Sequence, residues 1–312
     1  MKHKTIALIA LIAGLNLLIL IYPEVALEAA SRGLNLWFNS FLPGILPFVV
    51  GANMLMALGA TRLLGRFLSP VMRAAFRLPG QAGFPLVMGI ISGYPLGAKI
   101  VCEMRAGGEI DRNDAQRLLG FSNNAGPLFI LGAVGVGMFG SASFGYLLMA
   151  AHYTAALAFG LALRIFAKAR HSRESGNPPL LETAPFSQIL GTAVKNAMET
   201  AVLVGGFIVL FSVLSALLNH FGLFGATGAR PAIFAGIFEM TGGLGQLGDF
   251  GLSRSIAALS AAILSFGGLS ILFQALSFIA KTDLNPSLYV LSKIAHGALA
   301  AIAAYIFYPV FF

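Results

Sequence analysis

The chain is 312 residues long, with 57% hydrophobic residues, 10% charged residues and a formal net charge of +8. Because soluble domains carry about 25% charged residues, this composition excludes an ordinary soluble core and predicts that much of the apolar surface faces lipid. The positive charge does not predict nucleic-acid binding, because the cations stand at the ends of apolar segments rather than on one polar face.

The N-terminal segment predicts a retained membrane anchor. Residues 6–21 are apolar and follow Lys2 and Lys4, an arrangement that resembles a signal peptide. Pro23 comes next without a small-residue cleavage site, so we interpret residues 1–33 as a transmembrane helix and its connector.

Further apolar segments approach the roughly 20 residues that cross a bilayer. With the N-terminus inside, most Lys and Arg residues near the ends of these segments fall on the cytoplasmic side, whereas Arg32, Arg230 and Arg254 fall outside. We therefore expect a multi-pass protein of the cytoplasmic (inner) membrane with a cytoplasmic N-terminus. The segments are 41–58, 118–139, 144–166, 201–218, 255–280 and 288–312.

Two more apolar segments, 84–101 and 231–248, are interrupted halfway by turn-forming residues. Such residues break a helix and free backbone groups that lipid cannot satisfy. Each segment is therefore predicted to form a re-entrant helical hairpin that enters and leaves the membrane on one side. The interrupting residues are Gly93, Tyr94, Pro95 and Gly97 in the first segment, and Thr241, Gly242, Gly243 and Gly245 in the second.

The two halves of the chain show the same order of parts. Residues 34–168 and 191–312 each hold a spanning segment, a hairpin, an interrupted helix and a final span, separated by a polar cytoplasmic linker at 169–190. GYPLG at 93–97 aligns with TGGLG at 241–245, and SNNAGP, which begins at Ser122, aligns with SFGGLS, which begins at Ser265. According to the charge pattern, the first set begins on the outer side of the membrane and the second on the cytoplasmic side, so the two sets have opposite topology. Inverted repeats with broken helices are typical of secondary transporters.

Four interruptions, two in each repeat, are expected to meet near the middle of the bilayer. A helix broken there exposes N–H groups at one half-helix end and C=O groups at the other, which can bind an anion and a cation respectively. The candidate substrate- or ion-binding residues in these interruptions are Ser92, Gly93, Tyr94, Pro95, Asn123, Asn124, Glu239, Thr241, Gly267, Gly268, Ser270 and Gln274.

For several polar residues a structural role competes with a functional one. The amides of Asn123 and Asn124 are equally consistent with stabilising a helix break and with contacting a ligand. For Glu239 we expect contact with a substrate or coupling ion rather than a structural pair, because placing a carboxylate at that depth in the membrane costs free energy. His152 and His296, at similar places in the last helix of each repeat, are interpreted as packing residues rather than as a proton relay.

The remaining candidates for chemistry favour structural roles. Lys99 and Lys293 are interpreted as snorkelling anchors, and Cys102 as a small apolar filler. A single cysteine also excludes an internal disulfide and a multi-cysteine metal site. The sequence contains no GxxxxGK[ST], HExxH, CxxC or GxSxG motif, so we expect no enzyme activity, no cofactor and no metal site.

The motifs taken together resemble a known family. FLPGILPF at Phe41, SGYPLGAKI at Ser92 and FSNNAGPLFILGAVG at Phe121 are similar to the sporulation integral membrane proteins of the YlbJ type, and FEMTGG at Phe238 and SFGGLSILFQ at Ser265 continue the pattern. These proteins belong to the wider nucleoside recognition (Gate) domain group. The resemblance implies two Gate repeats and a fold similar to that of the concentrative nucleoside transporters, in which hairpins and unwound helices hold a substrate and a coupling cation.

Together, these observations predict an all-α polytopic membrane protein with two inverted repeats. Its expected activity is secondary transport of a small polar solute, a nucleoside or another metabolite, coupled to Na⁺ or H⁺. The expected partners are the lipid bilayer, the solute and further copies of the chain in a homo-oligomer, without nucleic acid. The alternative is a non-transporting scaffold or signalling protein of the sporulation type, in which polar residues at the breaks bond only to backbone and leave no cavity.

Overall fold

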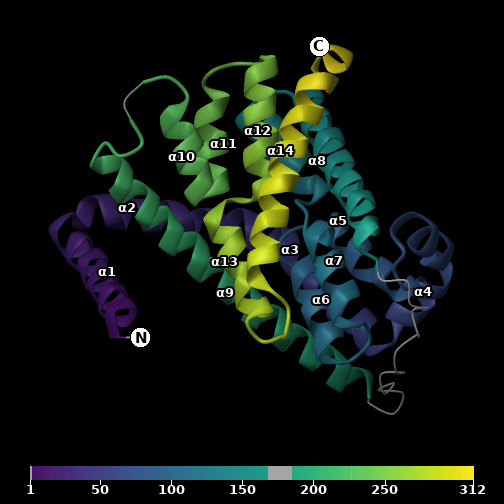
Figure 1. Cartoon of the computed structure of the whole chain (residues 1–312). Helices are drawn as coiled ribbons and strands as arrows, with labels where there is room; N and C mark the ends of the chain where they lie inside the picture. Colours follow the sequence, from purple (N-terminus) through teal and green to yellow (C-terminus); the bar gives the residue numbers. More distant parts are fainter. Residues whose placement is uncertain (1, 168–184, 226) are drawn as a thin grey trace.

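The computed structural model describes residues 2–167, 185–225 and 227–312, and the regular elements in these ranges are all helical (Figure 1). The all-α prediction is therefore confirmed for this part of the chain. The helices are α1 Lys2–Ile21, α2 Pro23–Leu36, α3 Leu42–Ala57, α4 Ala60–Val71, α5 Gly83–Ser92, α6 Leu96–Ala106, α7 Arg112–Ser122, α8 Ala142–Leu163, α9 Phe186–His220, α10 Arg230–Phe238, α11 Met240–Gly248, α12 Arg254–Phe266, α13 Gly268–Ile279 and α14 Pro286–Phe311. π-Helical stretches occur at Trp37–Phe41, Met72–Phe76 and Phe129–Met138.

Several of these helices suit a bilayer by length and apolarity. Within the described ranges, four stretches are long and apolar enough to cross one: Ala142–Phe166, Phe186–His220, Arg254–Ile279 and Pro286–Phe311. Two bent pairs pass the same test as units, and they turn by 100° and 89° at their breaks. The pairs are Thr5–Ile21 with Pro23–Asn39 and Leu46–Ala57 with Ala60–Phe76.

The structure refines two predicted segments. The connector after the first helix is itself helical, because residues 23–36 form α2, which packs along α9. Gly33 permits this approach, since a Cβ there would lie 3.1 Å from Val209 Cα. Helix α9 begins at Phe186, so the last residues of the predicted 169–190 linker belong to a helix. The rest of that linker, up to residue 184, lies outside the described residues.

The two segments that were predicted as hairpins each form a pair of helices that pack against each other, α5 with α6 and α10 with α11. Helices α5 and α6 approach so closely that a Cβ on Gly89 would lie 3.2 Å from Gly97 Cα. In the α10–α11 pair, a Cβ on Gly243 would overlap the backbone of Gly236 and lie 2.6 Å from Ala232 O. Glycine at these positions therefore allows two helix backbones to touch.

The second hairpin turns at a different residue from the predicted one. Residues 241–245, which the sequence suggested as the turn, lie within α11, and the chain leaves helical geometry at Glu239 instead. The Glu239 carboxylate accepts hydrogen bonds from the backbone N–H groups of Thr241 and Gly242, at 3.0 and 2.7 Å, and so caps α11. Because this cap satisfies free N–H groups at the helix start, the glycine-rich segment continues as helix. Alignment of 93–97 with 241–245 therefore misplaces the break.

The two interrupted helices break where predicted. Helix α7 ends at Ser122, and residues 123–126 form a non-helical stretch before the helix resumes. Helix α12 ends one residue before Gly267, which has a φ of +88°, and Gly268 follows with a φ of +75°. Glycine adopts this left-handed conformation without the steric cost of a Cβ. The breaks occupy corresponding places in the SNNAGP and SFGGLS motifs.

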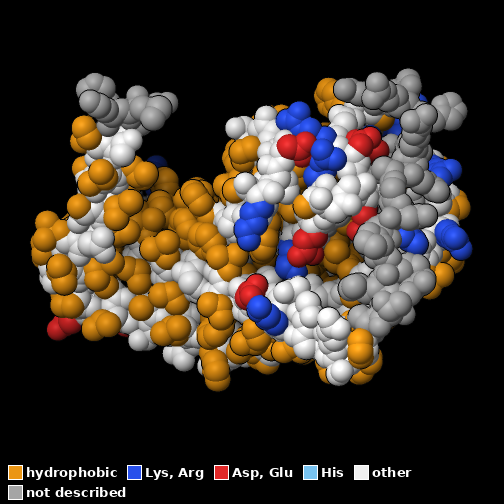
Figure 2. All heavy atoms as spheres, turned by 90° about the horizontal axis from the view of Figure 1, so that it is seen from below, with side chains coloured by type: hydrophobic (Ala, Val, Ile, Leu, Met, Phe, Trp, Pro, Cys, Tyr) orange, Lys and Arg blue, Asp and Glu red, His pale blue; other side chains and the backbone are white. Residues whose placement is uncertain are grey.

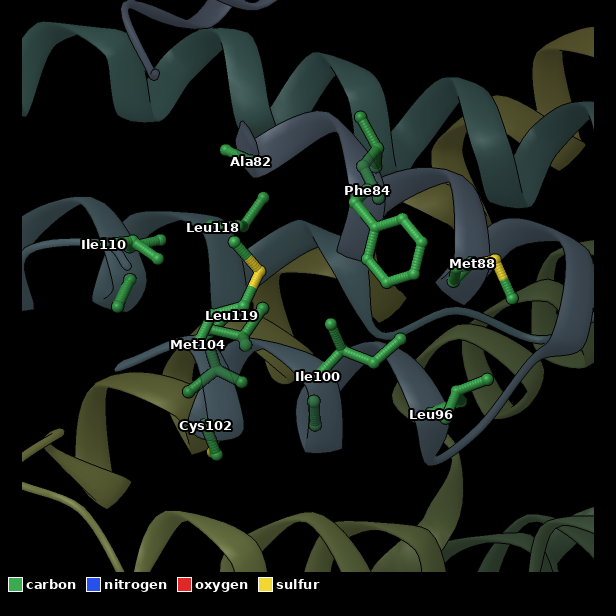
Figure 3. Close-up of a cluster of buried hydrophobic side chains, with 14 of the residues drawn as sticks. Ala82, Phe84, Met88, Leu96, Ile100, Cys102, Met104, Ile110, Leu118 and Leu119 are labelled. Atoms are coloured by element: carbon green, nitrogen blue, oxygen red, sulfur yellow. The ribbon is translucent and has the colours of Figure 1, made fainter. Parts of the chain in front are cut away.

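Buried apolar side chains form two large clusters that join the halves of the chain. The first surrounds α5, α6 and α7, where Phe84, Ile100 and Leu119 lie together, and it includes side chains from α13 and α14 (Figure 3). Cys102 is buried in this cluster, in agreement with its interpretation as an apolar filler. The second cluster joins Phe129–Met138 and α8 to α11, α12 and α14.

Charged side chains gather at one end of the molecule, whereas hydrophobic side chains cover most of the rest of the face seen from below (Figure 2). At that end the α6–α7 loop meets the α13–α14 loop. Arg105 donates hydrogen bonds to both Asp283 carboxylate oxygens, at 2.9 and 2.8 Å, and Arg112 donates to the Asp283 carbonyl oxygen at 2.9 Å. The hydrogen-bonded Arg105 guanidinium lowers the pKa of Asp283 below its ordinary value.

Candidate functional site

The helix breaks of each half pack against each other. A Cβ on Gly93 would lie 2.7 Å from Gly126 N, so the α5–α6 turn contacts the break that follows α7. In the second half, a Cβ on Gly268 would lie 3.0 Å from Met240 N, so the α10–α11 turn contacts the break that follows α12. Each half therefore pairs its hairpin turn with its own interrupted helix.

Tyr94 joins the two pairs of breaks. Its hydroxyl group lies 3.2 Å from the carbonyl oxygens of both Leu264 and Ser265, in the last turn of α12, and donates to them. These two carbonyls are among those that a helix leaves free at its C-terminal end. A side chain from the first half thus satisfies a helix end in the second, and all four breaks form one site.

A cavity of about 540 Å³ lies beside these breaks. Its wall is mainly apolar, with contributions from α2, α3, α9 and α13 and from both hairpins. Such a volume lies within the roughly 300–1,000 Å³ typical of small-molecule sites. Seven of the twelve predicted site residues line it: Ser92, Gly93, Tyr94, Glu239, Thr241, Ser270 and Gln274.

The polar groups of the cavity wall are few and mostly neutral. Ser92 is buried, and its hydroxyl oxygen has no hydrogen-bond partner among the described residues. The Gln274 amide donates to the Ser270 hydroxyl at 3.3 Å. Among the described residues that line the cavity, Glu239 is the only carboxylate, and none is Lys, Arg or His. The wall can therefore hold a ligand with an apolar body and hydrogen-bond donors at one end.

The other predicted residues lie behind the wall rather than in it. The Asn123 amide nitrogen donates to the Tyr289 hydroxyl at 2.7 Å, which is a structural contact. Asn124 donates to Phe121 O at 2.9 Å, and its own side-chain oxygen is buried without a hydrogen-bond partner in the described part of the chain. Gly267 and Gly268 shape the α12–α13 break, and Pro95 faces α9 on the far side of the hairpin turn.

Lys293 was not predicted as part of the site, and its interpretation as a snorkelling anchor is wrong. Lys293 lies well inside the length of α14, away from both helix ends, and it is only 1% exposed. The ammonium nitrogen lies 3.1 Å from the Tyr94 hydroxyl oxygen, 3.1 Å from Asn123 O and 3.3 Å from His296 Nδ1. It also lies 4.9 Å from the centre of the Tyr94 ring, in a cation–π contact. The cation therefore sits directly behind the wall of the cavity.

The two histidines connect this cation to the breaks. His296 Nε2 lies 3.0 Å from His152 O, so Nε2 carries the proton and the Nδ1 lone pair accepts from Lys293. His152 Nε2 accepts from the Ala125 N–H at 3.0 Å, so His152 Nδ1 carries the proton and donates to the Ser265 hydroxyl at 2.7 Å. Both imidazoles are thus neutral donor–acceptor links, a more specific role than the packing that was predicted.

Lys99 is also buried, at 4% exposure, so its interpretation as an anchor is wrong as well. It differs from Lys293 in having a countercharge, because its ammonium lies 3.1 Å from a Glu103 carboxylate oxygen and 3.0 Å from Asn53 Oδ1. Lys99 therefore forms an i,i+4 ion pair within α6 with the partly exposed Glu103, and its hydrogen bond to Asn53 links α6 to α3.

A signal for Lys293 exists in the sequence. It stands seven residues after Pro286, where α14 begins, which places it about 10 Å along the helix at 1.5 Å per residue. His296 follows at a spacing of three, so both polar side chains lie on one face of an otherwise apolar segment. A cation and an imidazole on one helix face inside a membrane segment favour a functional pair.

Comparison with known proteins gives two matches. The family model described as nucleoside recognition (Gate) matches residues 38–169. The sporulation integral membrane protein YlbJ of Bacillus subtilis (strain 168) is 34% identical over 334 residues, which cover 96% of this chain and 82% of that protein. No solved structure matches the chain.

Proposed function

Since the chain belongs to the YlbJ family of integral membrane proteins and carries a Gate domain, we propose that it is a secondary transporter of a small polar solute, a nucleoside or a metabolite of similar size, coupled to a cation. The observation that carries this proposal is the cavity of about 540 Å³ at the point where four helix breaks meet. Transporters place their substrate and ion sites where discontinuous helices converge.

The chemistry of the wall supports a solute with several hydrogen-bond donors. The Glu239 carboxylate accepts two backbone N–H groups and keeps further lone pairs for a ligand. The unpartnered Ser92 hydroxyl supplies a second polar contact. An unsatisfied buried polar group costs about 1–3 kcal/mol, and a bound solute would recover that cost.

The proposed mechanism uses the two halves as inverted repeats, with residues 34–168 forming one and residues 191–312 the other. In each half a hairpin turn packs on an interrupted helix, which is the pairing expected of related repeats. Tyr94 links the two pairs by hydrogen bonds to the end of α12. Alternating access would come from one pair of elements rocking against the other around the site.

The rival function, a non-transporting scaffold or signalling component, also has an observation in its favour. Both Glu239 carboxylate oxygens and the Asn124 amide nitrogen bond to backbone groups, as a purely structural role requires. However, a scaffold predicts that the polar residues at the breaks bond only to backbone and leave no cavity. The cavity and the unpartnered Ser92 hydroxyl favour the transporter.

A thermal-shift screen of the purified protein with nucleosides, amino acids and small carboxylates tests the proposal. A solute of the transported class should raise the melting temperature, and uptake of the same solute into proteoliposomes should follow. Glu239→Gln and Ser92→Ala should weaken the stabilisation, because both side chains line the cavity. Glu199→Gln is the matched control, because Glu199 is an exposed carboxylate on α9 that does not line the cavity. A flat response across the screen would favour the scaffold.

A further inference from the structure

We propose that the coupling cation is a proton carried by the Lys293 side chain, and that binding of the solute releases it. Transport would then be an exchange of solute for H⁺ without a requirement for Na⁺. This inference rests on the proposed transport function and specifies its energy source. It follows from the position of the Lys293 ammonium between the cavity wall and the breaks of both halves.

The Lys293 ammonium is buried without a countercharge. Among the described residues, no carboxylate lies within ion-pair distance of it, whereas Lys99 is paired with Glu103. Its three N–H groups are all used, by Tyr94 Oη, Asn123 O and His296 Nδ1. The geometry therefore fits the protonated form, held by three neutral acceptors. Burying an unpaired charge is costly, so loss of any one acceptor favours loss of the proton.

The groups around Lys293 single it out as the proton carrier. The titratable side chains that face this cluster are His296 and Tyr289 from α14, His152 and Tyr153 from α8, Tyr94 from the α5–α6 turn and Cys102 from α6. Both imidazoles already use their two nitrogens in hydrogen bonds to neighbouring groups. Tyr153 donates to Ala125 O at 2.8 Å. None of these groups supplies a negative charge to balance Lys293 at neutral pH.

Tyr94 couples the cavity to the cation. One part of this residue lines the cavity, and its hydroxyl oxygen accepts a hydrogen bond from Lys293 while donating to α12. A solute that moves the Tyr94 side chain or its hairpin removes an acceptor and a cation–π contact from Lys293 at the same time. The N–H bond then breaks, the electron pair stays on the nitrogen, and the proton passes to water on the open side. The neutral amine regains a proton after the solute leaves.

The same contacts explain why Na⁺ is not needed. In broken-helix transporters, carbonyl oxygens at half-helix C-terminal ends coordinate the coupling Na⁺. Here Asn123 O, just beyond the end of α7, is occupied by the Lys293 ammonium. The carbonyls of Leu264 and Ser265, at the end of α12, are occupied by the Tyr94 hydroxyl. The side chains of the protein thus fill the positions that a metal cation would use.

Proton release on binding tests the inference directly. The full chain in weakly buffered detergent solution is mixed with the solute that stabilises it most in the thermal-shift screen, and a pH-indicator dye records the protons released. The wild type should release about one proton per solute bound, and the solute Kd should then fall by up to tenfold for each unit of pH increase. Replacing NaCl with choline chloride should leave the Kd unchanged.

Three variants separate the role of Lys293 from general effects. Lys293→Met removes the proton, and Lys293→Arg keeps a permanent positive charge, so neither should release protons on binding. Lys99→Met, at a buried lysine that has a countercharge, should release protons as the wild type does. Should Lys293→Met fail to fold, Lys293→Arg carries the test. Proton release that persists in Lys293→Arg, or a Kd that depends on Na⁺, would overturn the inference while transport stands. If no solute stabilises the protein, both proposals fail.

Discussion

The contact between α10 and α11 leads to a sharp prediction for two glycines two residues apart in the same helix. In Gly243→Ala, the added methyl group meets the backbone of Gly236 and comes within 2.6 Å of Ala232 O, so the hairpin must open. Such overpacking costs about 1–3 kcal/mol. In Gly245→Ala, the new Cβ has no atom within 4 Å, and Ala is favoured over Gly in a helix by roughly 0.5–1 kcal/mol.

The two substitutions should therefore change stability in opposite directions. We expect Gly243→Ala to be less stable than Gly245→Ala by about 1.5–4 kcal/mol, the sum of the two effects. Equilibrium unfolding in mixed micelles, with increasing SDS and circular dichroism at 222 nm as the signal, measures this difference. If residues 241–245 formed an open turn, both variants would behave alike, so equal unfolding free energies would refute the hairpin geometry.

Three further predictions concern the site and the loop contact. Tyr94→Phe removes the hydroxyl that serves Lys293 and α12, so unfolding in the same micelles should require about 1–3 kcal/mol less. Gly267→Ala forces a φ of +88° on a residue with a Cβ, and a loss of about 1–2 kcal/mol is expected in that assay; an unchanged value would show that the break relaxes. Asp283→Asn removes the hydrogen-bonded ion pair with Arg105. Because this pair lowers the pKa of Asp283, its contribution is present above about pH 4 and disappears as pH falls through the lowered pKa, so the melting temperatures of wild type and Asp283→Asn should converge in acid.

The helix breaks could be predicted from the sequence because their causes are local. A proline or a pair of glycines in an apolar segment disfavours helix whatever surrounds it. Pro95, Gly126 and Gly267 each lie in or beside an observed break. The turn at Glu239 was placed too late, because a carboxylate cap competes with the glycines that follow it. A glycine-rich run marks either a turn or a close helix contact, and only the partner helix decides which.

Lys293 shows what local pattern cannot supply. Its acceptors Asn123 and Tyr94 lie 170 and 199 residues away in the sequence, in the other half of the chain. Sequence spacing places Lys293 and His296 on one face of a helix, but it does not say whether that face meets lipid, water or protein. The spacing therefore marks Lys293 and His296 as a candidate pair, but it does not show that the cation is buried. The distinction comes from the packing of α14 against α8 and α12.

The hydrogen bonds of Tyr94 and Lys293 form a seam between the two halves of the chain. At this seam a conformational change and a change of charge would act on the same atoms. Tyr94 belongs to the first half, Lys293 to the second, and each bonds to a helix end of the opposite half. Hydrogen bonds can be exchanged for others more readily than the close-packed apolar clusters that also join the two halves can be rearranged. A proton on Lys293 strengthens this seam, and its loss weakens it. The protonation state of one side chain can therefore bias which arrangement of the two halves the protein adopts.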